Sequence, residues 1–174
     1  MRYHNITKDD MLNGDGLRVV LWVAGCNHCC KECQNPITWD PDGGLLFDEA
    51  AKEEIFEQLD KSYISGITFS GGDPLHPSNR FDVRNLMAEI KEKYPNKTIW
   101  LYTGDSWEDI LSYPLLKYVD VLVDREFHVE EKDVKLLKLS TTPLYELALG
   151  GTAVGTGLNA PEGFDSAVAE EIAK

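Results

Sequence analysis

The sequence predicts a single α/β domain in which parallel β-strands alternate with α-helices. Apolar, β-branched segments of strand length alternate along the chain with segments that have the apolar period of a helix. Such alternation is typical of right-handed βαβ units around a parallel sheet. The chain has 174 residues, of which 43% are hydrophobic and 27% charged, which is enough for one buried core of ordinary composition.

The individual elements follow from local composition. Four segments are rich in β-branched and apolar residues and are expected to be strands: residues 17–23, 66–70, 98–102 and 118–123. Three segments have helical spacing: residues 50–60, 79–94 and the Pro-interrupted stretch 107–116. Asp48 stands where an N-cap is needed for the first helix. Strand and helix therefore alternate from residue 17 to residue 123.

The unusual residues gather where these strands end. The cysteine-rich segment follows the first strand, Gly71-Gly72-Asp73-Pro74 the second, Thr103-Gly104 the third and Asp124 the fourth. The carboxyl ends of parallel strands meet at one edge of a sheet, and that edge is where α/β proteins bind ligands. We expect one functional site there.

Charge and cysteine placement limit the function classes. The formal net charge of −13 disfavours nucleic acid and anionic membrane surfaces as partners. The first eight residues lack the apolar core of a signal peptide. All four cysteines lie between Cys26 and Cys33, which favours a metal site in a reducing compartment over a disulfide framework. These features predict a cytoplasmic protein.

Cys26, Cys30 and Cys33 have the spacing C-x₃-C-x₂-C. Three thiolates can hold three irons of a four-iron cluster and leave the fourth iron open to a substrate. The alternative is a zinc site that uses all four cysteines, although zinc sites usually place their two arms well apart. Cys29 is either a fourth ligand that would close the cluster or, as we favour, a thiol packed beside the loop.

Other motifs carry weaker signals. Glycines such as Gly71 and Gly72 would let the backbone approach a ligand closely, although a tight turn fixed by Pro74 explains them equally. The glycine-rich residues 150–157 lack the lysine of a phosphate-binding loop. His28, inside the cysteine segment, is a candidate hydrogen-bond donor to cluster sulfur. The remaining histidines are expected at the surface or in packing: His4, His76 and His128.

Taken together, the motifs resemble one known family. Five stretches carry the resemblance in the family's order and spacing: NGDGLRV (13–19), GCNHCCKECQNP (25–36), TFSGGDPL (68–75), TIWLYTG (98–104) and VDVLVD (119–124). In them the chain resembles the activating proteins of anaerobic ribonucleotide reductases, which are small radical S-adenosylmethionine (SAM) enzymes. The match covers residues 1–138 of a single domain spanning 1–174, and residues 139–174 form a divergent tail. Relatives also commonly carry a basic residue at the position of Cys29.

The resemblance implies a fold and a set of site residues. The family fold is a shortened, open (β/α) partial barrel with parallel strands inside and helices outside. By the resemblance, Cys26, Cys30 and Cys33 would ligate a [4Fe–4S] cluster whose open iron binds the methionine end of SAM. The residues that would contact SAM are Gly71, Gly72 and Asp73 at its ammonium group, Glu32 and Gln34 beside the adenine, and Thr103 and Gly104 near the sulfonium or ribose.

The resemblance also implies an activity and partners. A reduced flavodoxin-type donor would supply one electron, and SAM would be cleaved to methionine and a 5′-deoxyadenosyl radical. That radical would take hydrogen from a glycine near the C-terminus of the reductase, with the cofactors rather than a side-chain base carrying the chemistry. Two alternatives stay open here. One is another small radical SAM enzyme, such as a pyruvate formate-lyase activase or a deazapurine-forming synthase, and the other is a non-catalytic metal-binding adaptor.

Overall fold

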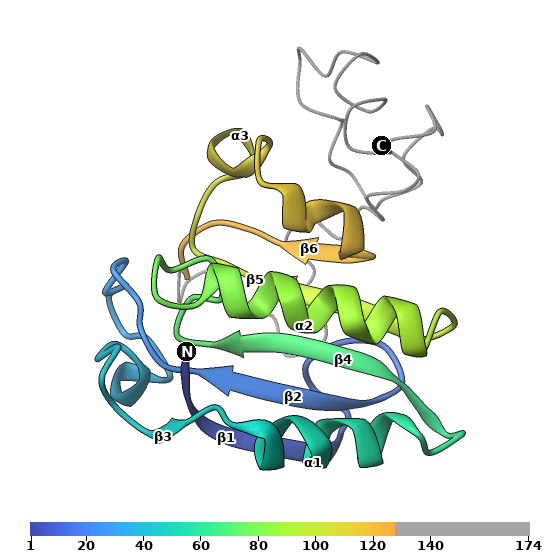
Figure 1. The fold of residues 1–174 in the computed structure, drawn as a ribbon. Coiled ribbons are helices and arrows are strands. Elements are labelled where there is room, and N and C mark those ends of the chain that lie inside the picture. Colours follow the sequence, from blue (N-terminus) through green and yellow to red (C-terminus); the bar gives the residue numbers. More distant parts are fainter. Residues whose placement is uncertain (128–174) are drawn as a thin grey trace.

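The computed structural model describes residues 1–127 and contains one mixed sheet (Figure 1). Its strands are β1 (Arg2–Asp10), β2 (Leu17–Val23), β3 (Leu45–Leu46), β4 (Ile64–Gly71), β5 (Thr98–Tyr102) and β6 (Val121–Val123). The helices are α1 (Glu49–Leu59), α2 (Arg80–Lys93) and α3 (Trp107–Ile110), with 3₁₀ turns η1 (Pro36–Thr38) and η2 (Pro114–Tyr118). The tail 139–174, with its glycine-rich residues 150–157, and His128 lie outside the described residues.

The four predicted strands and both long helices are present. β2 and β5 have the predicted bounds, and the Asp48 side chain accepts a hydrogen bond from the Ala51 amide as the N-cap of α1. The third helical segment is divided into α3 and η2, because Pro114 starts a new turn. η2 takes up Tyr118, so β6 begins only at Val121.

The prediction of a wholly parallel sheet was wrong at one side of the sheet. The strand order is β3-β1-β2-β4-β5-β6, and β1 runs antiparallel to both β2 and β3. β1 was not predicted from the sequence, because most of its residues are polar and only Ile6 is buried. The sheet is therefore mixed but mostly parallel.

The parallel strands position the site. β2, β4, β5 and β6 follow one another across the sheet in chain order, and each neighbouring pair of them is parallel. Right-handed crossovers in a constant direction place their helices on one face of the sheet. Figure 1 shows α1 and α2 on that face, with the arrows of β2 and β4 pointing the same way.

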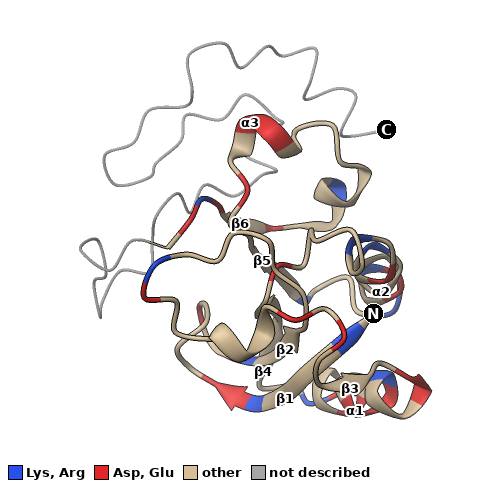
Figure 2. Ribbon diagram, turned by 90° about the vertical axis from the view of Figure 1, so that its left-hand side faces the viewer, with Lys and Arg blue, Asp and Glu red and all other residues tan. Residues whose placement is uncertain are grey.

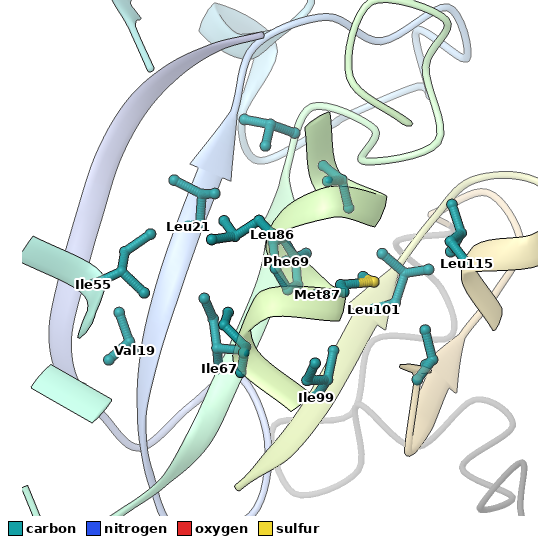
Figure 3. Close-up of a cluster of buried hydrophobic side chains, with 14 of the residues drawn as sticks. Val19, Leu21, Ile55, Ile67, Phe69, Leu86, Met87, Ile99, Leu101 and Leu115 are labelled. Atoms are coloured by element: carbon teal, nitrogen blue, oxygen red, sulfur yellow. The ribbon is translucent and has the colours of Figure 1, made fainter. Parts of the chain in front are cut away.

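The core lies between this face and the helices. Alternate strand residues point to opposite faces, and one set packs against the helices (Figure 3). Strand residues of the core include Val19, Leu21, Ile67, Phe69, Ile99 and Leu101, and helix residues include Ile55, Leu86 and Met87. Nearly all of them are fully buried. This layer fixes the strand ends on which the loops of the site are mounted.

The opposite face holds a buried guanidinium. Arg18 is 0% exposed and donates five hydrogen bonds, all to neutral oxygens, which lie on Asp15, Ile67, Thr68 and Thr98. Its charged group also lies 5.2 Å from the centre of the Trp100 ring. Burial lowers the pKa of Arg18 to about 10. The side chain joins the β1–β2 turn to β4 and β5 through contacts that satisfy all its donors.

The charge of the protein is spread over its surface. Figure 2 shows acidic residues on α1, α2, α3 and the end of β1, with lysines and arginines among them. No helix in the described part of the chain is long and apolar enough to cross a membrane.

Candidate functional site

The loops that follow β2, β4, β5 and β6 meet at the carboxyl edge of the sheet, as the sequence predicted. The Asp73 amide donates to the Gly25 carbonyl (2.7 Å), which joins the loops after β2 and β4. The Asp73 carboxylate reaches the loop after β5, where it accepts from the Thr103 hydroxyl (3.0 Å). The Arg125 amide after β6 donates to the Asp105 carbonyl (2.9 Å). A continuous chain of hydrogen bonds therefore links the four loops.

The cysteine loop, residues 26–33, is closed at its base by main-chain contacts. The amide of Gly25 donates to the Thr38 carbonyl (2.7 Å), and the amide of Cys26 donates to the Trp39 carbonyl (3.1 Å). The turn η1 brings Thr38 and Trp39 back to this point. The two ends of the loop are thus fixed on the sheet independently of any side chain within it.

The four thiols of this loop differ in exposure. Cys26, Cys30 and Cys33 are partly buried, whereas Cys29 is exposed and has a left-handed backbone (φ 48°). A positive φ is uncommon for a residue with a side chain. The geometry therefore sets Cys29 apart from the three thiols of the predicted ligand set.

Main-chain amides face two of the three partly buried sulfurs. The Asn35 amide donates to the Cys33 sulfur (3.4 Å). Burial raises the pKa of Cys26, while hydrogen bonds from the backbone amides of His28 and Cys29 oppose that rise. Amide donors of this kind stabilise thiolate ligands and tune the potential of a cluster. His28 therefore does face a sulfur, but through its backbone and not through its ring.

The thiols of the described residues do not form a ready-made site for a single metal ion. Tetrahedral zinc with four sulfurs holds them about 3.8 Å apart, given a Zn–S bond of about 2.3 Å. In the described part of the chain, the side chains gathered within 4.8 Å are His28, Asp73 and Asp105, and three thiols do not come that close. A four-iron cluster is large enough to join three thiols spread around a loop.

The Gly-Gly-Asp turn, residues 71–73, packs directly against the base of the cysteine loop. Gly71 has φ +102°, and its position leaves no room for a side chain beside the backbone of Trp22. A Cβ on Gly72 would lie 2.5 Å from the Gly25 carbonyl oxygen and 2.9 Å from that of Thr38. Both glycines are therefore required by the approach of two main-chain segments.

Asp73 is buried and joins several groups. Its carboxylate accepts hydrogen bonds from the amides of Leu75 (2.8 Å) and Gly104 (3.1 Å), in addition to the Thr103 hydroxyl. Asn79, also buried, donates from its side chain to the Asp73 carbonyl (2.9 Å) and the Ala24 carbonyl (2.8 Å). This network holds the turn in place from both sides.

The remaining predicted residues lie around this centre. Glu32 and Gln34 are exposed at the rim of the cysteine loop, and Glu32 has a left-handed backbone (φ 61°). Thr103 is buried, and its hydroxyl is engaged with Asp73 and with the Asp105 amide (3.1 Å). Gly104 lies under the ring of His28. Asp124 accepts from the Trp107 amide (3.0 Å), so it serves the start of α3.

Known proteins are similar to this chain over the region that contains the site. A family model described as a 4Fe-4S single cluster domain matches residues 12–146. An anaerobic ribonucleoside-triphosphate reductase-activating protein of Enterobacteria phage T4 is 45% identical over 139 residues, which cover 80% of this chain and 87% of that protein. The protein of that name from Escherichia coli (strain K12) is 37% identical over 141 residues, covering 79% and 92%.

The chain belongs to this family of activating proteins. That membership confirms the two predicted cofactors, a [4Fe–4S] cluster and SAM. It also confirms the prediction that the chain is a radical SAM activating enzyme. The comparisons therefore favour an activating enzyme over the metal-binding adaptor, the alternative that the sequence left open.

Two residues of the site were missed or misjudged at the sequence level. The ring of His28 contacts Asp73 instead of a cluster sulfur. Asn79 was not predicted as a site residue, although it is a polar residue at the first position of the predicted helix 79–94. In the structure it caps no helix amide by its side chain and instead joins the ends of two loops.

Proposed function

We propose that this protein activates an anaerobic ribonucleoside-triphosphate reductase by generating a radical on a glycine near the reductase C-terminus. The observation that carries the proposal is the cysteine loop, with three partly buried thiols and one exposed thiol, fixed against the Gly-Gly-Asp turn. When bound, the reduced cluster and SAM supply a carbon-centred radical that can take a hydrogen atom from glycine.

The three partly buried cysteines would hold the cluster. Main-chain amides at Cys26 and Cys33 would donate hydrogen bonds to these cluster ligands. Cys29, which is exposed, would stay off the cluster, so one iron would remain free for SAM. The protein's part is to hold a thiolate set of this shape and to leave the fourth position open.

SAM would be held from two directions. The open iron would bind its methionine end, and the Gly-Gly-Asp turn would contact its amino group. Glu32 and Gln34 at the exposed rim would contact the adenine. Thr103 would act through Asp73, since its hydroxyl is already engaged there, and Gly104 would border the sulfonium or ribose.

The fold suits this use. Within residues 1–127, parallel strands in chain order with their helices on one face support a shortened, open (β/α) partial barrel. We propose that this barrel belongs to a single domain of residues 1–174. An exposed site at the carboxyl edge would admit a glycine loop from the reductase. A flavodoxin-type donor would supply the electron, and the clustered free thiols favour work in the reducing cytoplasm.

Anaerobic reconstitution tests the proposal. We expect the chain to take up iron and sulfide, to release 5′-deoxyadenosine when reduced in the presence of SAM, and to produce a glycyl radical signal on added reductase. Cys30→Ala should abolish all three results, because two thiols cannot hold the cluster. A chain that forms the cluster but yields no 5′-deoxyadenosine would contradict the proposed function.

A further inference from the structure

The ring of His28 lies outside the roles described so far. It projects from the middle of the cysteine loop across the site, and its Nε2–H donates to the Asp73 Oδ2 (2.8 Å). The same nitrogen is 3.4 Å from Asp105 Oδ1, and Nδ1 is 3.7 Å from Glu126 Oε1. One side chain therefore joins the cysteine loop to the loops after β4, β5 and β6.

This position is set tightly by its surroundings. A Cβ added to Gly104 would lie 2.4 Å from His28 Cδ2 and 2.6 Å from Cγ, so the ring rests directly on the Gly104 backbone. Only 19% of the His28 side chain is exposed. Asp73, its main partner, is itself held by three further hydrogen-bond donors, from Leu75, Thr103 and Gly104. The ring thus contacts a fixed point on the far side of the site.

We propose that His28 is a positioning residue for SAM, because its contact with Asp73 sets the spacing between the cysteine loop and the Gly-Gly-Asp turn. The inference rests on the proposed function, in which SAM is held by the open iron on one side and by the turn on the other. A ligand held at two points binds well only when the spacing of those points is fixed. The backbone bonds at Gly25 and Cys26 fix the base of the loop, and His28 fixes its far part.

His76 offers a matched comparison. It too is a histidine in contact with the cysteine loop, since its Nε2 lies 3.2 Å from Asn27 Oδ1. Its other ring nitrogen bonds Ser78, which is local, and its side chain does not reach the Asp73 carboxylate through any of the described contacts. If any histidine against the loop were sufficient, the two would be equivalent.

The first test removes the ring. His28→Ala leaves all four thiols and both backbone bonds at the loop base, so we expect iron content and cluster absorbance like those of the wild type. SAM affinity, measured anaerobically by equilibrium dialysis, should fall about 10- to 100-fold, the usual loss when a group that orients a site is removed. The change that SAM causes in the EPR signal of the reduced cluster should be lost at SAM concentrations that saturate the wild type.

Two variants separate positioning from general packing. In His28→Gln the amide nitrogen can take the place of Nε2 and donate to Asp73, so affinity should return to within about threefold of the wild type. His76→Ala should bind SAM as the wild type does. Loss of the cluster in His28→Ala, or unchanged SAM affinity in that variant, would overturn the inference.

A double-mutant cycle tests the place of the ring. The three atoms nearest to a Cβ added at Gly104 all belong to the His28 ring, so a methyl group there points at the ring and only the Gly104 backbone is left to border SAM. Gly104→Ala should therefore weaken SAM binding by displacing His28, whereas the same change in the His28→Ala background should add little. Independent, additive losses would overturn the proposal. A wild-type chain that binds neither cluster nor SAM would instead contradict the proposed function, so the two failures are distinguishable.

Discussion

Replacing Gly72 by alanine should damage the junction between the cysteine loop and the Gly-Gly-Asp turn. The new methyl group would lie 2.5 Å from the Gly25 carbonyl oxygen, where ordinary contacts begin at 3.4 Å, so the backbones must separate by most of an ångström. Overpacking of this kind costs about 1–3 kcal/mol. The separation would also stretch the bond from the Asp73 amide to Gly25, and a buried amide left without a partner costs about 1–3 kcal/mol.

Because the two costs share one displacement, we expect a total of about 2–4 kcal/mol. For a chain of this size the melting temperature should fall by roughly 5–15 °C, which anaerobic thermal unfolding followed by circular dichroism would measure. Gly43→Ala is the matched control, since its Cβ would meet its nearest neighbour at 3.1 Å in a partly exposed turn. A Gly72→Ala protein that melts within about 2 °C of that control would refute the reasoning.

Three further changes test other parts of the structure. Cys29→Ser should leave the iron content of the reconstituted protein unchanged, since this thiol is exposed; loss of iron would make it a ligand. Arg18→Met should lower the free energy of unfolding in urea by roughly 3–5 kcal/mol, because it leaves buried oxygens without donors, and a loss under about 1 kcal/mol would contradict that role. Asp48→Ala should cost about 1 kcal/mol in the same assay by removing the cap on Ala51, and no measurable loss would show the cap to be dispensable.

Much of the fold could be predicted because the parallel strands are buried and apolar. β2 and β5 were located to the residue, since continuous β-branched runs have few other interpretations. β1 and β3 could not be predicted in this way. β1 is mostly polar, so its apolar pattern is too weak to mark a strand. β3 is only two residues long, Leu45–Leu46, which is too short to show any period.

The site was predictable at the level of segments and not of side chains. Parallel topology requires the loops after β2, β4, β5 and β6 to meet, whatever their sequences. It does not determine which groups pair there. The direction of the His28 ring depends on the buried carboxylate of Asp73, 45 residues away in sequence, and on the absence of a side chain at Gly104. Contacts between residues so far apart in sequence leave no pattern in the neighbouring residues from which they could be predicted.

The bond between the Gly25 carbonyl and the Asp73 amide has a consequence for the maturation of the protein. Its two residues are distant in sequence, so the Gly-Gly-Asp turn meets the base of the cysteine loop only when β4 lies beside β2. In a zinc finger the metal supplies the energy of folding. Here the bonds that join the cysteine loop to the sheet are between main-chain groups, so they need no metal to form. Cells short of iron should therefore accumulate a folded, cluster-free protein that can be loaded later without new synthesis.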